Sequence, residues 1–94
     1  MVKSFKSRAL RDYWLKGSAK GIRPDWRDRV HDLLSVLDAA DVPQDTALPT
    51  FGFHPLKGDR KGDYALTIRG NWRITFRWKD GHAVRVNMED YHGR

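Results

Sequence analysis

The side chains of this chain that could do chemistry are gathered in three short polar clusters. The clusters are residues 54–58 (HPLKG), 70–73 (GNWR) and 89–92 (EDYH). Each lies at the edge of an apolar run, where a side chain can be held firmly and still reach solvent. Together they supply imidazole, ammonium, guanidinium, carboxylate and phenol groups. Such a set could transfer a proton and neutralise a phosphate, which is what the cleavage of RNA requires.

Two histidines, an arginine and an aspartate have candidate roles. His54 and His92 are candidate proton carriers, because an unperturbed imidazole titrates near neutral pH. Trp72 belongs to an apolar set spaced by two residues, so Arg73 should be fixed on the opposite face of its strand, where it could bind a phosphate bidentately. Asp90 could orient an imidazole or an arginine. Each residue also has a plainer interpretation, as a solvated or structural side chain or as half of a simple ion pair.

Lys57 and Tyr91 complete the candidate catalytic set. Lys57 begins a loop of six residues with two glycines and three cations, which suits contact with an anionic ligand. A surface connection between strands is an equally good interpretation of this loop. Tyr91 could stack on an unpaired base, and its ring predicts that this end of the chain is docked. The predicted catalytic residues are His54, Lys57, Arg73, Asp90, Tyr91 and His92.

The second half of the chain predicts a sheet with one apolar and one cationic face. Apolar residues alternate through 64–68, 72–78 and 84–88, which is the period of a strand with one buried face. The other face then carries five cations and one carboxylate. We interpret it as an anion-binding face, with the ordinary solvent face of an antiparallel sheet as the alternative. The predicted RNA- or ribosome-binding residues are Arg60, Lys61, Arg69, Arg77, Lys79 and Arg85.

The elements that must position these side chains form an α+β domain of the order β-α-α-β-β-β. A strand is expected at 2–5, a helix at 7–16 with Gly17 as its stop, and a second helix from Pro24 to about residue 40. Residues 41–53 are expected to form a loop. Turns at 70–71 and at Asp80-Gly81 should join the three later strands into a meander. The prediction is two antiparallel helices packed on an antiparallel sheet.

Composition limits the class of protein. Ninety-four residues predict a single domain, 1–94, and the net charge of +6 favours a polyanionic partner. The absence of cysteine excludes disulfides, thiolate nucleophiles and cysteine-based zinc sites. No histidine pairs with another ligand at metal spacing, so neither a metal nor a cofactor is expected. No apolar stretch approaches the roughly 20 residues of a membrane span, so a cytoplasmic location and no membrane partner are expected.

The sequences HPLKGDR at 54–60, GNWRITF at 70–76 and EDYH at 89–92 resemble those of the HigB plasmid-maintenance killer toxins, in the RelE/ParE superfamily. Residues 2–5 and 37–40 fit the same pattern, so the resemblance extends over nearly the whole chain. It implies a compact α+β fold with two helices against an antiparallel sheet. Tyr64 stands where many relatives carry Trp, a change that we expect to alter packing only.

The resemblance also implies a function. Such toxins are ribosome-dependent endoribonucleases that cleave mRNA in the ribosomal A site by metal-free attack of the 2′-OH, with functional positions that fall on the same six predicted catalytic residues. His92, oriented by Asp90, would be the base or acid, with His54 second, while Arg73 and Lys57 would stabilise phosphoryl charge. The implied partners are a HigA-type helix-turn-helix antitoxin, the 70S ribosome and mRNA, with operator DNA bound only through the antitoxin complex.

Two other functions remain open at this point. ParE-type relatives on the same fold inhibit DNA gyrase, and fold alone does not decide function. A gyrase inhibitor has no need of His54, Lys57 and His92 together, so the site distinguishes the two. A plain RNA-binding module would survive loss of His92 but lose affinity with Arg73 and Lys57. The acidic stretch 30–50 is a candidate contact for a basic antitoxin segment, which charge reversal at Asp38 and Asp41 would test.

Overall fold

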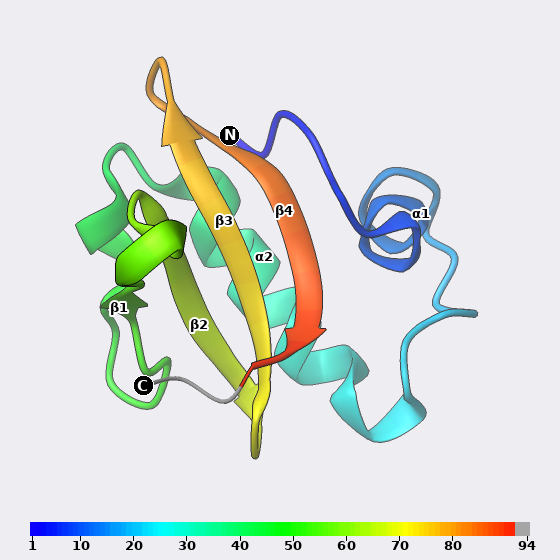
Figure 1. Cartoon of the computed structure of the whole chain (residues 1–94). Coiled ribbons are helices and arrows are strands. Elements are labelled where there is room, and N and C mark those ends of the chain that lie inside the picture. The colour runs from blue at the N-terminus through cyan, green and yellow to red at the C-terminus, as the bar shows by residue number, and fades with distance from the viewer. Residues whose placement is uncertain (92–94) are drawn as a thin grey trace.

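The computed structural model describes residues 1–91 and contains two helices and a four-stranded antiparallel sheet (Figure 1). The helices are α1 (Arg8–Lys16) and α2 (Arg27–Ala39). The strands are β1 (His54–Pro55), β2 (Asp63–Arg69), β3 (Trp72–Lys79) and β4 (His82–Asp90), in the spatial order β1-β2-β3-β4. The α+β class and the meander of β2, β3 and β4 are as predicted. No helix in this part of the chain is long and apolar enough to cross a membrane.

Both helices begin and end where local chemistry predicts. The Ser7 hydroxyl accepts a hydrogen bond from the Leu10 amide at 3.2 Å, and Gly17 ends α1 with φ of 71°. A left-handed residue of this kind suits glycine, which has no Cβ to clash. Pro24 opens a short 3₁₀ turn, Pro24–Trp26, that leads directly into α2. Proline is tolerated there because its missing N–H would have no helical partner.

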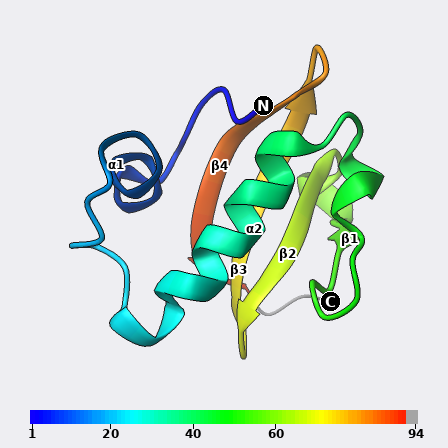
Figure 2. The same ribbon diagram turned by 180° about the vertical axis from the view of Figure 1, so that it is seen from behind.

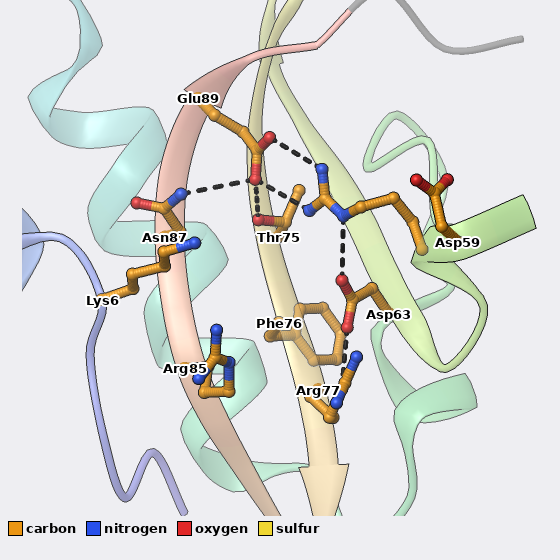
Figure 3. A pocket seen from close by; sticks show the side chains of 10 residues that line it. Lys6, Asp59, Asp63, Thr75, Phe76, Arg77, Arg85, Asn87 and Glu89 are labelled. Carbon is orange, nitrogen blue, oxygen red and sulfur yellow. Dashed lines mark hydrogen bonds and ion pairs between the residues drawn. The ribbon is translucent and has the colours of Figure 1, made fainter. Parts of the chain in front are cut away.

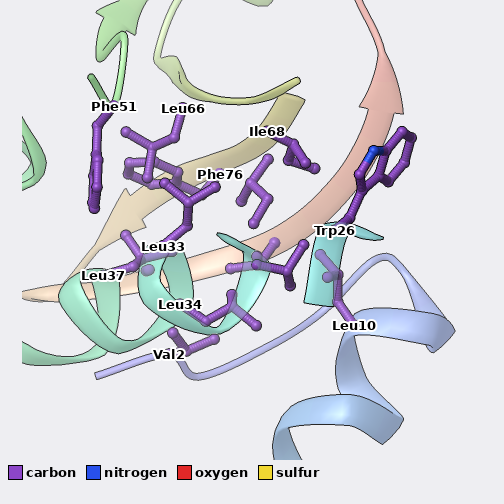
Figure 4. Close-up of a cluster of buried hydrophobic side chains, with 14 of the residues drawn as sticks. Val2, Leu10, Trp26, Leu33, Leu34, Leu37, Phe51, Leu66, Ile68 and Phe76 are labelled. Atoms are coloured by element: carbon purple, nitrogen blue, oxygen red, sulfur yellow. The ribbon is translucent and has the colours of Figure 1, made fainter. Parts of the chain in front are cut away.

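One face of the sheet is covered by α2 and forms the core. Figure 2 shows α2 lying over the sheet and running roughly along the strands, whereas α1 is seen end-on beside β4. Only α2 therefore covers the face, while α1 packs at the β4 edge. Figure 4 shows side chains from both helices meeting those of the strands. The largest fully buried side chains of this core include Leu10, Leu33, Leu34, Leu37, Leu66, Ile74 and Phe76.

A β-bulge in β4 changes which side chains face the core. Thr75 pairs with Asn87 but Arg77 pairs with Val84, so β4 contains an extra residue at this point. Ala83 is consequently buried, while Val84 pairs with Arg77 on the opposite face. The prediction that Val84 faces the core is therefore wrong, because a strict period of two cannot include a bulge.

The segments outside the meander differ from the prediction in detail. The expected strand at 2–5 consists of two isolated parallel bridges to β4, Val2 with Ala83 and Phe5 with Val86. The expected loop 41–53 contains a 3₁₀ turn, Pro43–Thr46, and is followed by the edge strand β1, which the sequence analysis missed. Asp38 accepts a hydrogen bond from the Val2 amide at 2.8 Å, so charge reversal at Asp38 would disturb the fold as well as any surface contact.

Candidate active site

The face of the sheet opposite α2, here called the open face, brings together residues from separate clusters. Register pairs His54 with Ala65 and Ala65 with Thr75. Directly opposed residues point to the same side of a sheet, and so do residues two apart along a strand. His54, Thr75 and Arg73 therefore share the open face. The predicted placement of Arg73 opposite the apolar set is confirmed.

His54 is held in one orientation by the backbone. Its Nδ1 lies 2.9 Å from the carbonyl oxygen of Gly52. A carbonyl only accepts, so Nδ1 carries the proton and Nε2 is the nitrogen left to exchange one. The side chain is half-buried on the edge strand β1. This arrangement suits a proton carrier that reacts through Nε2.

A network of charged side chains crosses the open face (Figure 3). Arg60 donates to both carboxylate oxygens of Glu89, at 3.1 and 3.0 Å, and its Nε donates to Asp63 at 3.0 Å. Arg77 donates to the other oxygen of Asp63 at 2.9 Å. The Glu89 carboxylate also accepts from Thr75. These bonds raise the pKa of Arg60, chiefly through Glu89, and lower the pKa of Glu89, chiefly through Arg60.

The same arginine connects this network to the C-terminal cluster. The guanidinium of Arg60 lies 5.7 Å from the centre of the Tyr91 ring, within reach of a cation–π contact. The Tyr91 amide donates to the carbonyl of Asn71 at 2.8 Å. The predicted docking of this end of the chain is thus confirmed as far as Tyr91. His92 lies outside the described residues.

Arg73 is anchored at the turn between β2 and β3. Its Nη1 donates to the carbonyl of Gly70, and to that of Trp72 at 3.3 Å. Its Nε is buried and has no hydrogen-bond partner among residues 1–91. A guanidinium on this face is the kind of group that binds a phosphoryl oxygen.

Two predicted catalytic residues lie away from the Arg60 network. Lys57 is exposed and lines a hollow formed by the end of β1, the loop after it and the start of β2, together with Lys61. Asp90 pairs with Trp72 and lines a groove of about 370 Å³, which also includes Trp26 and Arg69. Asp90 follows Glu89 in the strand, so its side chain takes the other side of β4. Any imidazole or arginine that Asp90 orients must therefore lie at this groove and not on the open face.

The six predicted RNA- or ribosome-binding residues do not form one free cationic surface. Arg60 and Arg77 are engaged by carboxylates, and Arg69 lies in the groove beside Asp90 because the register shifts between Thr67 and Arg69. Lys61 lies in a turn and Lys79 at the end of β3, and both are exposed. Arg85 lines a cleft of about 310 Å³ on the open face.

The role of Asp63 was not predicted. The alternation of Ala65 and Thr67 extends back to this residue, so the period of two would have placed a second carboxylate on the open face. Among residues 1–91, no three His, Cys, Asp or Glu side chains come together in a way that could hold a metal ion.

Comparisons with known proteins agree with this fold and these motifs. Residues 3–92 match the family model for the HigB-like toxin, described as a RelE-like toxin of type II toxin–antitoxin system HigB. Endoribonuclease HigB of Proteus vulgaris is 41% identical over 92 residues, which are 98% of this chain and 100% of that protein. Toxin HigB-1 of Vibrio cholerae is 30% identical over 59 residues, which are 62% of each chain.

A solved structure gives independent support for the fold. The crystal structure of a YafQ mutant from E. coli superposes with a TM-score of 0.58 and 15% identity, covering 96% of this chain and 93% of that one. With the family model matching nearly the whole sequence, the chain belongs to the HigB-like family of RelE-like toxins of type II toxin–antitoxin systems.

Proposed function

We propose that this chain is a ribosome-dependent endoribonuclease that cleaves mRNA in the ribosomal A site and thereby inhibits translation. Membership of the HigB-like family and the name of its Proteus vulgaris relative support the nuclease activity. The observation that carries the proposal is the shared open face, where register places the His54 imidazole on the same side as the Arg73 guanidinium. A proton carrier and a phosphate-binding cation on one accessible surface are the groups that RNA cleavage needs.

The proposed reaction is an internal transfer at one phosphodiester. A base takes the proton of the 2′-OH, the 2′-oxygen bonds to the adjacent phosphorus, and the bond from phosphorus to the 5′-oxygen breaks. An acid returns a proton to the leaving 5′-oxygen, which gives a 2′,3′-cyclic phosphate and a 5′-OH. His92 and His54 are the proposed proton carriers. Arg73 and Lys57 would stabilise the phosphoryl oxygens.

Dependence on the ribosome follows from the few groups that the protein itself supplies. On the open face, Arg60, Asp63 and Glu89 are bound to one another in a network. This face offers a polar cleft of about 310 Å³ to a flexible strand. The ribosomal A site would hold the mRNA in a reactive geometry, which supplies the orientation that the toxin lacks. The protein would therefore act in the cytoplasm.

The proposed regulatory partner is a HigA-type antitoxin with a helix-turn-helix domain. The family is defined by type II toxin–antitoxin systems, and in such a system the toxin would reach operator DNA only through its antitoxin. Co-expression with a tagged antitoxin followed by size-exclusion chromatography tests this partner. A toxin that elutes alone under these conditions would contradict it.

The decisive experiment maps mRNA ends in a translating extract with and without ribosomes. The wild type is compared with His92→Ala, His54→Ala and Arg73→Ala, and with Lys20→Ala, an exposed cation in the loop between the helices, as control. We expect cuts within codons that need ribosomes, persist in Lys20→Ala and are lost in the site variants. Intact mRNA together with continued growth arrest in cells would refute the proposal and direct the search to DNA gyrase.

A further inference from the structure

Lys6 and Arg85 differ from the other cations of the open-face cleft. The cleft is lined by four cations, of which Arg60 and Arg77 are in ion pairs with Asp63 and Glu89. Neither Lys6 nor Arg85 forms an ion pair with any residue of the described chain, 1–91, and both are exposed. Figure 3 shows Lys6 on the N-terminal segment and Arg85 on β4, away from Asp59 on the far side of the cleft. Two cations therefore keep their charge for an outside ligand.

The position of Arg85 depends on the bulge in β4. Its φ of 54° lies in the left-handed region, which is unfavourable for residues other than glycine. Glycine would fit this backbone without strain, and bulges often use it. The chain instead places a long cation there, and the bulge aims its side chain into the cleft. Strain of this kind is common at functional sites.

The N-terminal segment fixes the bulge and brings Lys6 beside it. The Arg85 amide donates to the Ser4 hydroxyl at 2.9 Å, and the Val86 amide donates to the Ser4 carbonyl at 3.0 Å. The Lys6 amide donates to the Val86 carbonyl at 2.8 Å. The two cations thus come from the two ends of the sequence, but backbone hydrogen bonds hold them together.

We propose that Lys6 and Arg85 form a binding site for a phosphodiester group of the RNA other than the one that is cleaved. The inference rests on the proposed function and extends it. Because of the bulge, Arg85 lies opposite Phe76, three residues from Arg73 along β3, which is roughly 10 Å at about 3.3 Å per residue. A phosphate held there is therefore separate from one held at Arg73. A guanidinium and an ammonium without competing carboxylates suit this ligand.

The test measures RNA binding as a function of salt. The toxin is titrated into a fluorescent single-stranded RNA whose 2′-hydroxyls are methylated, so that binding is seen without cleavage. The variants are Lys6→Gln with Arg85→Gln, and Lys20→Gln with Arg11→Gln as a control that removes the same charge from exposed positions elsewhere. Losing one phosphate contact should reduce the slope of log K against log salt by about 0.7. The affinity should fall equally for all sequences, and the control pair should keep the wild-type slope.

Arg85→Gly separates this role from a structural one. Glycine relieves the left-handed strain, so the variant should melt at a temperature no lower than that of the wild type and still bind RNA more weakly. A wild-type slope in both Arg85→Gly and the double variant, with cleavage by the wild type intact in the translating extract, would overturn the site while leaving the proposed function standing. Unchanged RNA binding with loss of antitoxin binding would also overturn it, and would assign the pair to a protein contact. Absence of wild-type cleavage would instead defeat the proposed function itself.

Discussion

Arg60→Ala tests whether the charged network of the open face is a structural clamp. Arg60 joins the loop before β2 to β4 through Glu89 and to β2 through Asp63, and it lies over the Tyr91 ring. From the sequence it is predicted to bind RNA. In the structure its donors are used within the protein, so its removal should first lower stability and only then disturb the site.

The size of the effect follows from the exposure of the three partners. Fully buried pairs cost about 3–5 kcal/mol when one partner is removed, and exposed pairs contribute about 0–1 kcal/mol. The side chains of Arg60, Glu89 and Asp63 are 36%, 23% and 17% exposed, between these limits. Glu89 keeps its bond from Thr75, and Asp63 keeps Arg77 at 2.9 Å. We therefore expect a loss of about 2 kcal/mol, or roughly 8–16 °C in Tm for a domain of this length.

The dependence on pH distinguishes the clamp from lost packing. Arg60 lowers the pKa of Glu89 in the folded protein below its ordinary value of 4.5. This contribution to stability is fully present above the unfolded pKa and disappears as the pH falls through the folded one. Urea unfolding of wild type and Arg60→Ala from pH 7 to pH 3 should therefore show a difference that is largest at pH 7 and shrinks below about 4.5.

The matched control for this experiment is Arg77→Ala. Its side chain is 49% exposed and contacts one carboxylate, so its removal should cost less than about 1 kcal/mol. A loss below about 0.5 kcal/mol in Arg60→Ala, or a difference that does not change with pH, would refute the clamp and return Arg60 to the RNA-binding set.

Three further predictions concern single residues. His54→Ala should reduce ribosome-dependent cleavage by about 10²–10⁴-fold without lowering Tm by more than a few degrees, because general acid–base catalysis typically contributes that factor; end mapping and thermal melting measure the two effects. Asp38→Ala should lower the free energy of unfolding in urea by about 1 kcal/mol, because the Val2 amide loses its acceptor. Gly52→Ala should destabilise more than Gly58→Ala, because both glycines have positive φ but a Cβ at Gly52 would lie 2.5 Å from the Thr67 hydroxyl; equal urea midpoints would contradict this.

The fold was predictable where local chemistry and apolar spacing agree. Ser7 and Gly17 bound α1 as expected, and Asp80 and Gly81 both have the positive φ that a tight hairpin needs. The edge strand β1 was not predictable, because two residues are too short to show a period. Val84 was misplaced because the bulge is set by tertiary hydrogen bonds that Ser4 accepts, and Ser4 is 81 residues from Arg85 in the sequence.

The candidate site was predictable as a set of residue types and less so as a geometry. Alternation placed Arg73 and Arg77 on the open face, and the basic loop added Arg60, but neither pattern showed that Arg60 and Arg77 are paired with a carboxylate. Their partner Asp63 lies at the first position of β2, where the period is only beginning. Asp90 takes the face of the sheet opposite to that of its neighbour Glu89, as alternation along a strand requires. The groove that Asp90 lines, however, also includes Trp26 from the helical half of the chain. A sequence pattern carries no information on such a meeting of distant segments.

The bridges from Val2 and Phe5 to β4 have a consequence for how the molecule folds. They join segments about 80 residues apart, and such distant contacts form late because closing a long loop costs entropy before any contact compensates it. The local meander of β2, β3 and β4 can form earlier, but the bulge cannot hold Arg85 in place until Ser4 arrives. Folding should therefore end with the step that completes the cleft, and a partly folded chain has a sheet before it has a functional surface.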